Sequence, residues 1–331
     1  MIDSYFSLPK PFFCLAPMED VTDLVFRQIV RDCSSPDLFF TEFVNVDGVQ
    51  SQGRENVSRR LRLGSNENNV VAQLWGLKPE NFYKTAREIV RGEFGSYVGI
   101  DLNMGCPEKS VVRSGACSGL INNPDRAVEI ISATQKGAAG KLPVSVKTRL
   151  GFNEINLEWP RILLKQQLSM LTIHARTRKE MSKVPAHWED IAAIVNLRNE
   201  ISPETLIVGN GDVSSRQQGA QLAQRYGLDG IMIGRGVFQD PFVFSEHSQW
   251  PKLTSLQKIA IYKQHVELFE AVWLPGGRAV HTLNKFCKIY INGFDGAKEM
   301  RDLLMKAGST TDLVSILEKY TRLQEQAQSK S

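Results

Sequence analysis

The sequence predicts an α/β protein, a (β/α)₈ TIM barrel followed by a C-terminal α-helical bundle. Eight short apolar runs recur between Phe12 and Ile233, and each is followed by a stretch with helical character. Alternation of strands and helices is typical of α/β folds with parallel sheets. Eight repeats over roughly 240 residues match a closed barrel better than an open, doubly wound sheet. After Pro251 only helical patterns remain.

The eight expected strands are short and rich in apolar or β-branched residues. Several are continuous apolar runs, as expected of parallel strands that are buried on both faces. In chain order, they are Phe12–Pro17, Leu38–Val44, Val70–Trp75, Val98–Asn103, Pro143–Arg149, Leu171–Ala175, Thr205–Gly209 and Gly230–Ile233.

Helix starts lie between and after these strands. Asn123 precedes a proline, which pairs a capping side chain with a residue suited to the first helical position. Thr254 and Gln257 form a capping-box pattern, and apolar residues follow at helical spacing. We therefore expect a barrel domain over residues 1–245 and a helical domain over residues 252–331.

Composition excludes several classes of protein. The contents of 42% hydrophobic and 23% charged residues are ordinary for a globular protein and exclude a disordered or fibrous one. The N-terminus has no signal-peptide pattern and no run of about 18 apolar residues occurs, so we expect no membrane segment. Five scattered cysteines form no disulfide framework or zinc motif, so we expect no metal and a reducing, cytoplasmic location.

The net charge of +4 originates in the C-terminal part of the chain. Lys and Arg balance Asp and Glu up to Pro251, at 28 each, whereas residues 252–331 hold 12 basic and 8 acidic residues. A basic module on a neutral body is consistent with binding of a polyanion such as nucleic acid.

Polar residues and glycines gather at the C-terminal ends of the expected strands, where barrels of this type carry their function. Glycines after the last two strands would let backbone N–H groups approach an anion, and Arg235 adds a charged donor. This pattern favours a phosphate site over simple tight turns. The candidate residues at the strand ends are Ala16, Pro17, Met18, Glu42, Asn45, Gln73, Asn103, Cys106, Lys147, Arg149, His174, Arg176, Asn210, Gly211, Asp212, Gly234 and Arg235.

Two pairs of cationic or titratable residues stand two positions apart on the fifth and sixth strands. Lys147 and Arg149 therefore share one strand face, and His174 and Arg176 share another. A lysine that ends an apolar strand is costly unless it meets an anion or a polarised oxygen, although it could instead extend to solvent. His174 could be a core histidine, but the neighbouring Arg176 favours a role in ligand binding.

Cys106 stands between Gly105 and Pro107 at the expected mouth of the barrel, and a loop with the composition of a mobile flap follows it. Most single cysteines are inert core residues. Beside cations, however, the pKa of this thiol would be tunable, so Cys106 is a candidate nucleophile or general acid. Cys117, within the flap, is the lesser candidate.

These segments resemble the tRNA-dihydrouridine synthase family over about residues 12–245, and the helical tail is similar to the family's RNA-binding domain. The segments that carry the resemblance are Leu15–Met18, Thr41–Val44, Ala72–Gly76, Gly99–Pro107, Pro143–Arg149, His174–Thr177, Gly209–Asp212 and Gly234–Gly236. The chain departs from the family's usual pattern in the flap Gly115–Gly119 and at Lys179–Lys183, where an aromatic residue is usual.

The resemblance implies a flavin-dependent oxidoreductase that reduces the C5–C6 bond of uridines in the tRNA D-loop, with NADPH or NADH reducing bound FMN. It also implies a monomer whose barrel is the catalytic domain and whose helical domain binds tRNA. The implied roles are flavin contacts from Ala16, Pro17, Met18, Gln73, Lys147 and His174, phosphate contacts from Asn210, Gly211, Asp212, Gly234 and Arg235, base contacts from Asn103, Arg149 and Arg176, and general acid catalysis by Cys106.

Two other functions stay open on the sequence. A barrel similar to dihydroorotate dehydrogenase would act on a free pyrimidine and would not need a basic helical tail. A barrel that had lost catalysis would only bind RNA, and the intact Cys106, Lys147 and His174 argue against that function.

Overall fold

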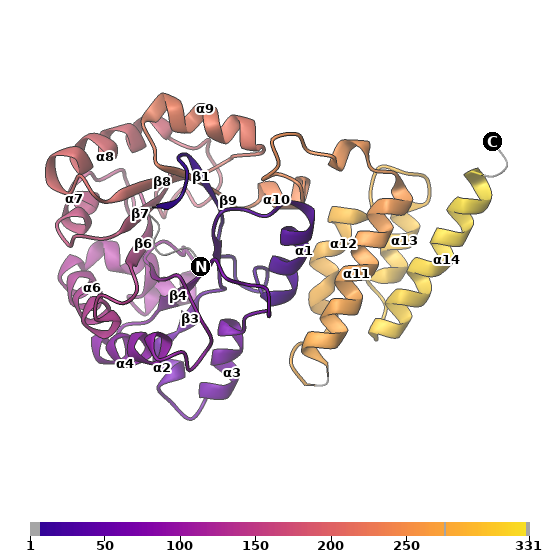
Figure 1. Cartoon of the computed structure of the whole chain (residues 1–331), viewed down its shortest axis with the longest axis horizontal. Coiled ribbons are helices and arrows are strands. Elements are labelled where there is room, and N and C mark those ends of the chain that lie inside the picture. Colours follow the sequence, from indigo (N-terminus) through magenta and orange to yellow (C-terminus); the bar gives the residue numbers. More distant parts are fainter. Residues whose placement is uncertain (1–6, 275, 329–331) are drawn as a thin grey trace. The chain divides into compact units, whose positions relative to one another are not determined.

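The barrel predicted from the sequence is confirmed in a computed structural model of the chain, which describes residues 7–274 and 276–328; the outermost residues of both expected domains lie outside these ranges. The strands are β1 (Phe12–Leu15), β2 (Phe39–Phe40), β3 (Val44–Asn45), β4 (Val70–Trp75), β5 (Gly99–Asn103), β6 (Val144–Arg149), β7 (Met170–His174), β8 (Leu206–Asn210) and β9 (Gly230–Ile233). They form one parallel sheet in the order β1-β9-β8-β7-β6-β5-β4-β2, with β3 beside β4 (Figure 1). A bridge between Cys14 and Leu38 closes the ring.

The second expected strand, Leu38–Val44, is in fact two short strands separated at residues 41–43. Thr41 causes the break in the ladder. Its N–H still donates to the carbonyl of Val71 at 3.0 Å, but its hydroxyl, rather than a backbone carbonyl, accepts the N–H of Gln73 at 3.0 Å. Glu42, which lies within this interruption, is buried, and its carboxylate accepts the backbone N–H of Asp20 at 2.8 Å.

Helices follow the strands as the sequence predicts. They are α1 (Leu24–Ser34), α2 (Val46–Val49), α3 (Arg54–Ser58), α4 (Pro79–Val90), α5 (Lys109–Arg113), α6 (Pro124–Ala138), α7 (Glu158–Leu164), α8 (Trp188–Ile201), α9 (Arg216–Tyr226), α10 (Gly236–Gln239), α11 (Ser255–Trp273), α12 (Asn284–Tyr290), α13 (Ala297–Leu304) and α14 (Thr310–Gln328), with 3₁₀ turns η2 (Arg59–Leu61), η3 (Cys117–Asn122), η4 (Trp250–Lys252) and η5 (Val280–Leu283). The expected caps are present: the Asn123 side chain accepts from the N–H of Arg126, and Thr254 and Gln257 form a reciprocal capping box. Among the described helices, none is long and apolar enough to span a membrane.

The chain divides into two compact units. One comprises residues up to Leu24 together with Pro36–Gly236, and the other comprises Val25–Ser35 together with Val237–Ser331. Helix α1 therefore belongs with the C-terminal helices, although it follows the first barrel strand in sequence. Its Phe26 ring stacks on that of Phe286 with centroids 4.9 Å apart. In the rest of this helical unit, α14 packs against α11 and α13.

The interior of the barrel changes from apolar to polar along the strands. On β8, Leu206 and Val208 precede Asn210, and on β7, Met170 precedes His174, always at alternate positions that share one face. Leu206, Val208 and Met170 belong to one buried apolar cluster. The N-terminal half of the barrel is therefore a packed core, and its C-terminal mouth is the part that can hold a ligand.

A buried ion pair joins the segments at the N-terminal end of the barrel. The Asp229 carboxylate accepts hydrogen bonds from the Lys10 ammonium at 2.7 Å, from the Arg198 guanidinium at 2.8 Å and from the N–H of Ile207 at 2.8 Å. Burial tends to raise the pKa of Asp229, but these partners more than offset it and the pKa lies below its usual value. The ionised form of the Asp229 carboxylate thus stabilises the folded protein.

Replacing Asp229 should destabilise the barrel strongly. In Asp229→Ala, Arg198 would lose the carboxylate that compensates its buried charge, and we expect a loss of about 3–5 kcal/mol in the free energy of unfolding measured in urea. Because the folded pKa is depressed, this stabilisation is present above the unfolded pKa of aspartate and is lost as the pH falls through the folded pKa. Glu129→Ala, which breaks the exposed pair with Arg126, is the control and should cost at most about 1 kcal/mol. Equal losses in the two variants would contradict the prediction.

Candidate active site

Neighbouring strands bring the predicted polar residues together at the barrel mouth, that is, at the C-terminal ends of the strands and the loops that follow them. The register pairs Asn103 of β5 with Lys147 of β6. It also pairs Arg149 with His174 of β7, and His174 with Asn210 of β8. Because the strands are parallel, these side chains share one end of the barrel.

A buried carboxylate, Asp101, organises the floor of this mouth. It accepts a hydrogen bond from Gln73 Nε2 at 2.7 Å and one from Ser145 Oγ at 2.6 Å. Burial raises its pKa to about 6, although the bonds from Ser145 and Gln73 and the charge of Lys147 act in the opposite direction. The sequence reasoning missed Asp101 as a site residue; its place two residues before Asn103, on the same strand face, is the signal that could have found it.

Asn103 shapes the loop that carries Cys106. Its Nδ2 donates to Gln73 Oε1 at 3.1 Å, and its Oδ1 accepts the backbone N–H groups of Gly105 at 3.1 Å and Cys106 at 2.9 Å. The side chain is buried and three of its hydrogen-bonding positions are occupied. One Nδ2 hydrogen is left to contact a ligand.

The Cys106 thiol is unusually acidic. A hydrogen bond from the Cys117 side chain lowers its pKa, burial opposes this effect, and the backbone of Glu108 and the charge of Arg149 lower it further, to about 7. Near neutral pH the group is therefore divided between thiol and thiolate. Such a group can exchange a proton with a substrate at physiological pH.

Arg149 connects two loops of the mouth. Its Nε donates to the carbonyl of Gly105 at 2.7 Å, and its Nη1 donates to the carbonyls of Thr177 at 3.1 Å and Met181 at 3.0 Å. These bonds fix the guanidinium rigidly. Among the described residues, Nη2 has no acceptor and is the nitrogen left for a ligand.

Lys147 and His174 experience a crowded positive environment. Burial and the charge of Arg149 lower the pKa of Lys147 to about 8, against the opposing effect of Asp101. Burial and the charges of Arg149, Lys147, Arg176 and Arg235 keep the pKa of His174 well below its usual value. His174 is therefore a neutral imidazole among cations, and the mouth as a whole attracts negative charge.

Along β7 and the loop that follows it, four buried polar atoms have no hydrogen-bond partner within the described part of the chain. They are Thr172 Oγ1, His174 Nδ1, Arg176 Nη1 and Arg178 Nε. Thr172 and His174 share one face of β7, and Lys147 of β6 stands opposite Thr172. Buried polar groups rarely stay unpaired, because each costs about 1–3 kcal/mol. Their concentration here fits a polar, anionic ligand.

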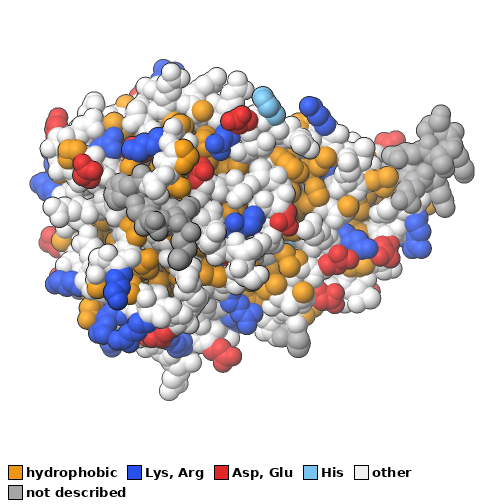
Figure 2. Space-filling view, viewed as in Figure 1, with side chains coloured by type: hydrophobic (Ala, Val, Ile, Leu, Met, Phe, Trp, Pro, Cys, Tyr) orange, Lys and Arg blue, Asp and Glu red, His pale blue; other side chains and the backbone are white. Residues whose placement is uncertain are grey.

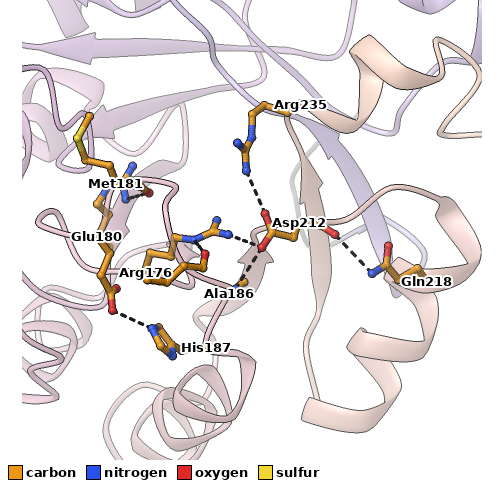
Figure 3. A network of polar contacts seen from close by, with 10 residues as sticks. Arg176, Glu180, Met181, Ala186, His187, Asp212, Gln218 and Arg235 are labelled. Carbon is orange, nitrogen blue, oxygen red and sulfur yellow. Dashed lines mark hydrogen bonds and ion pairs between the residues drawn. The ribbon is translucent and has the colours of Figure 1, made fainter.

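Asp212 lies at the centre of an ionic network at the ends of β8 and β9 (Figure 3). Its carboxylate pairs with Arg176, accepts from Arg235 Nη2 at 3.0 Å and accepts the backbone N–H of Ala186 at 3.2 Å. Arg176 is buried and also donates from Nε to the carbonyl of Val184 at 2.6 Å. The carboxylate therefore positions two arginines, of which Arg235 is exposed at the mouth.

The glycines and the β1 end form an open cradle beside this network. A Cβ on Gly234 would make only ordinary contacts, 3.5 Å from Ala16 Cβ and 3.9 Å from Met18 Sδ. Packing within the protein therefore does not require a glycine at this position, and the free space adjoins the segment Ala16–Met18. Gly211, by contrast, has a φ of 142°, which favours glycine for the turn itself.

A second cluster, not expected from the sequence, holds three carboxylates. Those of Glu19, Asp20 and Glu42 lie within 4.8 Å of one another. The Arg60 guanidinium donates to Glu19 at 2.6 Å, and Glu42 accepts the N–H of Asp20. Arg60 thus supplies the positive charge that such a cluster requires.

Comparison with known proteins identifies the family. A family model described as "Dihydrouridine synthase (Dus)" matches residues 14–328. A Staphylococcus aureus (strain Mu50 / ATCC 700699) protein, "Probable tRNA-dihydrouridine synthase", is 46% identical over 316 residues, covering 95% of this chain and 94% of that protein. A Bacillus subtilis (strain 168) protein, "Probable tRNA-dihydrouridine synthase 2", is 45% identical over 318 residues, covering 95% of each chain.

Solved structures with low identity share the fold. A dihydroorotate dehydrogenase (DHODH) from Eimeria tenella in complex with ferulenol has a TM-score of 0.50 at 12% identity, over 70% of this chain and 78% of that one. Histamine dehydrogenase from Rhizobium sp. 4-9 has a TM-score of 0.51 at 13% identity, over 77% of this chain and 48% of that one. The family match over nearly the whole chain is decisive: the chain belongs to the dihydrouridine synthase family.

Proposed function

We propose that the chain reduces the C5–C6 bond of uridines in tRNA to give dihydrouridine, with FMN as cofactor and NADPH or NADH as reductant. The names of the relatives support tRNA as the substrate. The observation that carries the proposal is the barrel mouth, where the neutral His174, the cations Lys147 and Arg149, and the acidic thiol of Cys106 lie on adjoining strands.

The residues at the mouth fit a flavin mononucleotide. The unpaired atoms of Thr172 and His174 need a polar partner, the space at Gly234 accepts a ligand atom, and Arg235 is a charged donor at the same end of the barrel. When bound, the flavin supplies a hydride to the uracil ring. We propose that Asn210, Gly211, Asp212, Gly234 and Arg235 hold the phosphate, with Asp212 acting by fixing Arg235, and that Ala16, Pro17, Met18, Gln73, Lys147 and His174 contact the ring and ribityl chain.

The chain's own residues then bind the base and transfer a proton. Saturation of the C5–C6 bond builds negative charge on a uracil carbonyl oxygen, which the free Nη2 of Arg149 and the remaining Nδ2 hydrogen of Asn103 can stabilise. Cys106 delivers its proton to carbon 5. Its pKa of about 7 keeps about half of the thiol protonated at neutral pH, as a general acid requires. Arg176, whose Nη1 is buried and unpaired, offers a further donor to the substrate.

The base must leave its stack to reach the mouth, so the RNA has to be held by its backbone and shape. We propose that residues 1–245 form the FMN-binding catalytic domain and that residues 252–331 bind tRNA. On the face in Figure 2, basic and acidic side chains are interspersed over the helical unit. Lys285 and Lys288 of α12 are exposed and offer a phosphate-binding pair. We further propose a cytoplasmic monomer.

The visible spectrum of the purified protein tests the proposal first. We expect flavin bands that bleach when NADPH is added under nitrogen and return when unmodified tRNA is added. Return with a free pyrimidine but not with tRNA would favour an enzyme that acts on a small substrate. A colourless protein that cannot be reconstituted with FMN would leave an RNA-binding barrel as the better description.

Cys106→Ala should separate the oxidation of NADPH from the formation of dihydrouridine. We expect the variant to keep its flavin and to oxidise NADPH, but to form dihydrouridine about 10²–10⁴-fold more slowly, because the proton donor is lost. Mass spectrometry of tRNA nucleosides measures the product. Cys33→Ala, which changes another partly buried cysteine, is the matched control and should be fully active. Full activity of Cys106→Ala would remove this thiol from the mechanism.

Charge reversal on α12 should weaken tRNA binding. In the double variant Lys285→Glu/Lys288→Glu, the slope of log affinity against log salt concentration should fall by about 2, because two phosphate contacts are lost. Lys141→Glu, at an exposed position before β6, serves as the control and should leave the slope unchanged. Equal effects in the two proteins would place the RNA surface elsewhere.

A further inference from the structure

A second thiol, Cys117, is held against Cys106. The adjacent residue Ser118 donates from both its hydroxyl, at 2.8 Å, and its backbone N–H, at 3.3 Å, to the carbonyl of Cys106. These two bonds join the start of η3 to the Cys106 loop. The Cys117 side chain also acts on Cys106 directly, because a hydrogen bond from it is the largest cause that lowers the pKa of the Cys106 thiol.

Cys117 adopts a backbone conformation that glycine would occupy at lower cost. Its φ is 51°, in the left-handed region, which costs a side-chain-bearing residue about 1 kcal/mol or more. Five other described non-glycine residues have positive φ, and all of them are exposed, whereas Cys117 is fully buried. Cys117 is therefore the one residue among these six whose left-handed backbone carries a buried side chain.

The charges around the pair determine which sulfur carries the proton. Burial, the contact with Cys106 and the charge of Glu19 keep the pKa of Cys117 well above its usual value, so this group stays a thiol. Around Cys106, the charges of Arg149 and Lys147 favour the thiolate, and the Glu108 carboxylate opposes it. In the hydrogen bond between them, Cys117 is therefore the donor.

We propose that Cys117 is a positioning residue for the proton donor of the reaction: its S–H group donates to Cys106 Sγ and stabilises the thiolate that remains after proton transfer. The proposal rests on the proposed function of Cys106 as the acid. In that step the S–H bond of Cys106 breaks, its proton forms the new bond to carbon 5 of uracil, and the electron pair stays on Cys106 Sγ. Cys117 keeps its own proton throughout.

Loss of the donor should make Cys106 a weaker acid. The folded protein holds the pKa of Cys106 near 7 with the Cys117 bond as the largest cause, so removing that bond moves the pKa upward. If the rise is one unit, the thiolate fraction at pH 7 falls about fivefold. A serine at position 117 would retain a donor, and a glycine would remove it while suiting the positive φ.

The test is the rate at which iodoacetamide alkylates Cys106 in the full-length protein, followed by mass spectrometry of its peptide as a function of pH. We expect a midpoint near 7 in the native protein, a higher midpoint and an about fivefold slower rate at pH 7 in Cys117→Gly, and recovery in Cys117→Ser. Cys117→Ala provides a second variant without a donor. Circular dichroism checks that each variant is folded. An unchanged midpoint in the folded glycine or alanine variant would overturn the proposal.

A second readout separates this proposal from the proposed function. In dihydrouridine formation, the decline in rate at high pH should move to higher pH in Cys117→Gly, and Cys33→Ser, with a cysteine remote in sequence, should leave both profiles unchanged. Should Cys106→Ala stay active while Cys117→Gly shifts the alkylation midpoint, the role of Cys106 as the acid fails and the thiol pairing stands. If the alkylation midpoint and the pH profile of dihydrouridine formation both stay unchanged in Cys117→Gly, the positioning role fails.

Discussion

The carboxylate of Asp101 sets the direction of the hydrogen bonds at the barrel mouth. An ionised carboxylate only accepts, so the amide of Gln73 must turn its Nε2 toward Asp101 and its Oε1 toward Asn103. Asn103 must then donate from Nδ2, which leaves its Oδ1 for the N–H groups of Gly105 and Cys106. One buried charge thereby fixes two amides and the loop that carries the acidic thiol.

The same mouth concentrates positive charge that the protein neutralises only in part. Arg176 has the carboxylate of Asp212, and Arg149 has backbone carbonyls that carry partial charge only. Lys147 relies on Asp101, with which it interacts across neighbouring strands. Burying such charges is expensive unless partners surround them. The unpaired polar atoms and the space at Gly234 lie in this same region, and an anionic ligand there would complete the charge balance.

The fold was predictable where local pattern decides it, and less so where side chains override the pattern. Short apolar or β-branched runs predicted the eight strand positions of the barrel, but the break in the second strand depends on the hydroxyl of Thr41, which no periodicity reveals. Helix α1 was expected in the barrel domain because it follows the first strand along the chain. The stacking of Phe26 on Phe286, which groups it with the C-terminal helices, cannot be read from the sequence. In the site, residue types at strand ends predicted the mouth, whereas the roles of Asp101 and Cys117 depend on register and on a loop contact.

The membership of α1 in the helical unit has a consequence for how modular the chain is. Between β1 and β2 the chain leaves one unit for the other and returns, so the two units are interleaved rather than consecutive. During synthesis, the apolar residues of α1, such as Val25, Phe26 and Ile29, emerge long before the α12 residue Phe286 that covers Phe26. A chain cut after Pro251 would leave this surface bare and prone to aggregation. The barrel is thus not separable at a single cut, and expressing the helical unit alone would require the segment Val25–Ser35 as well.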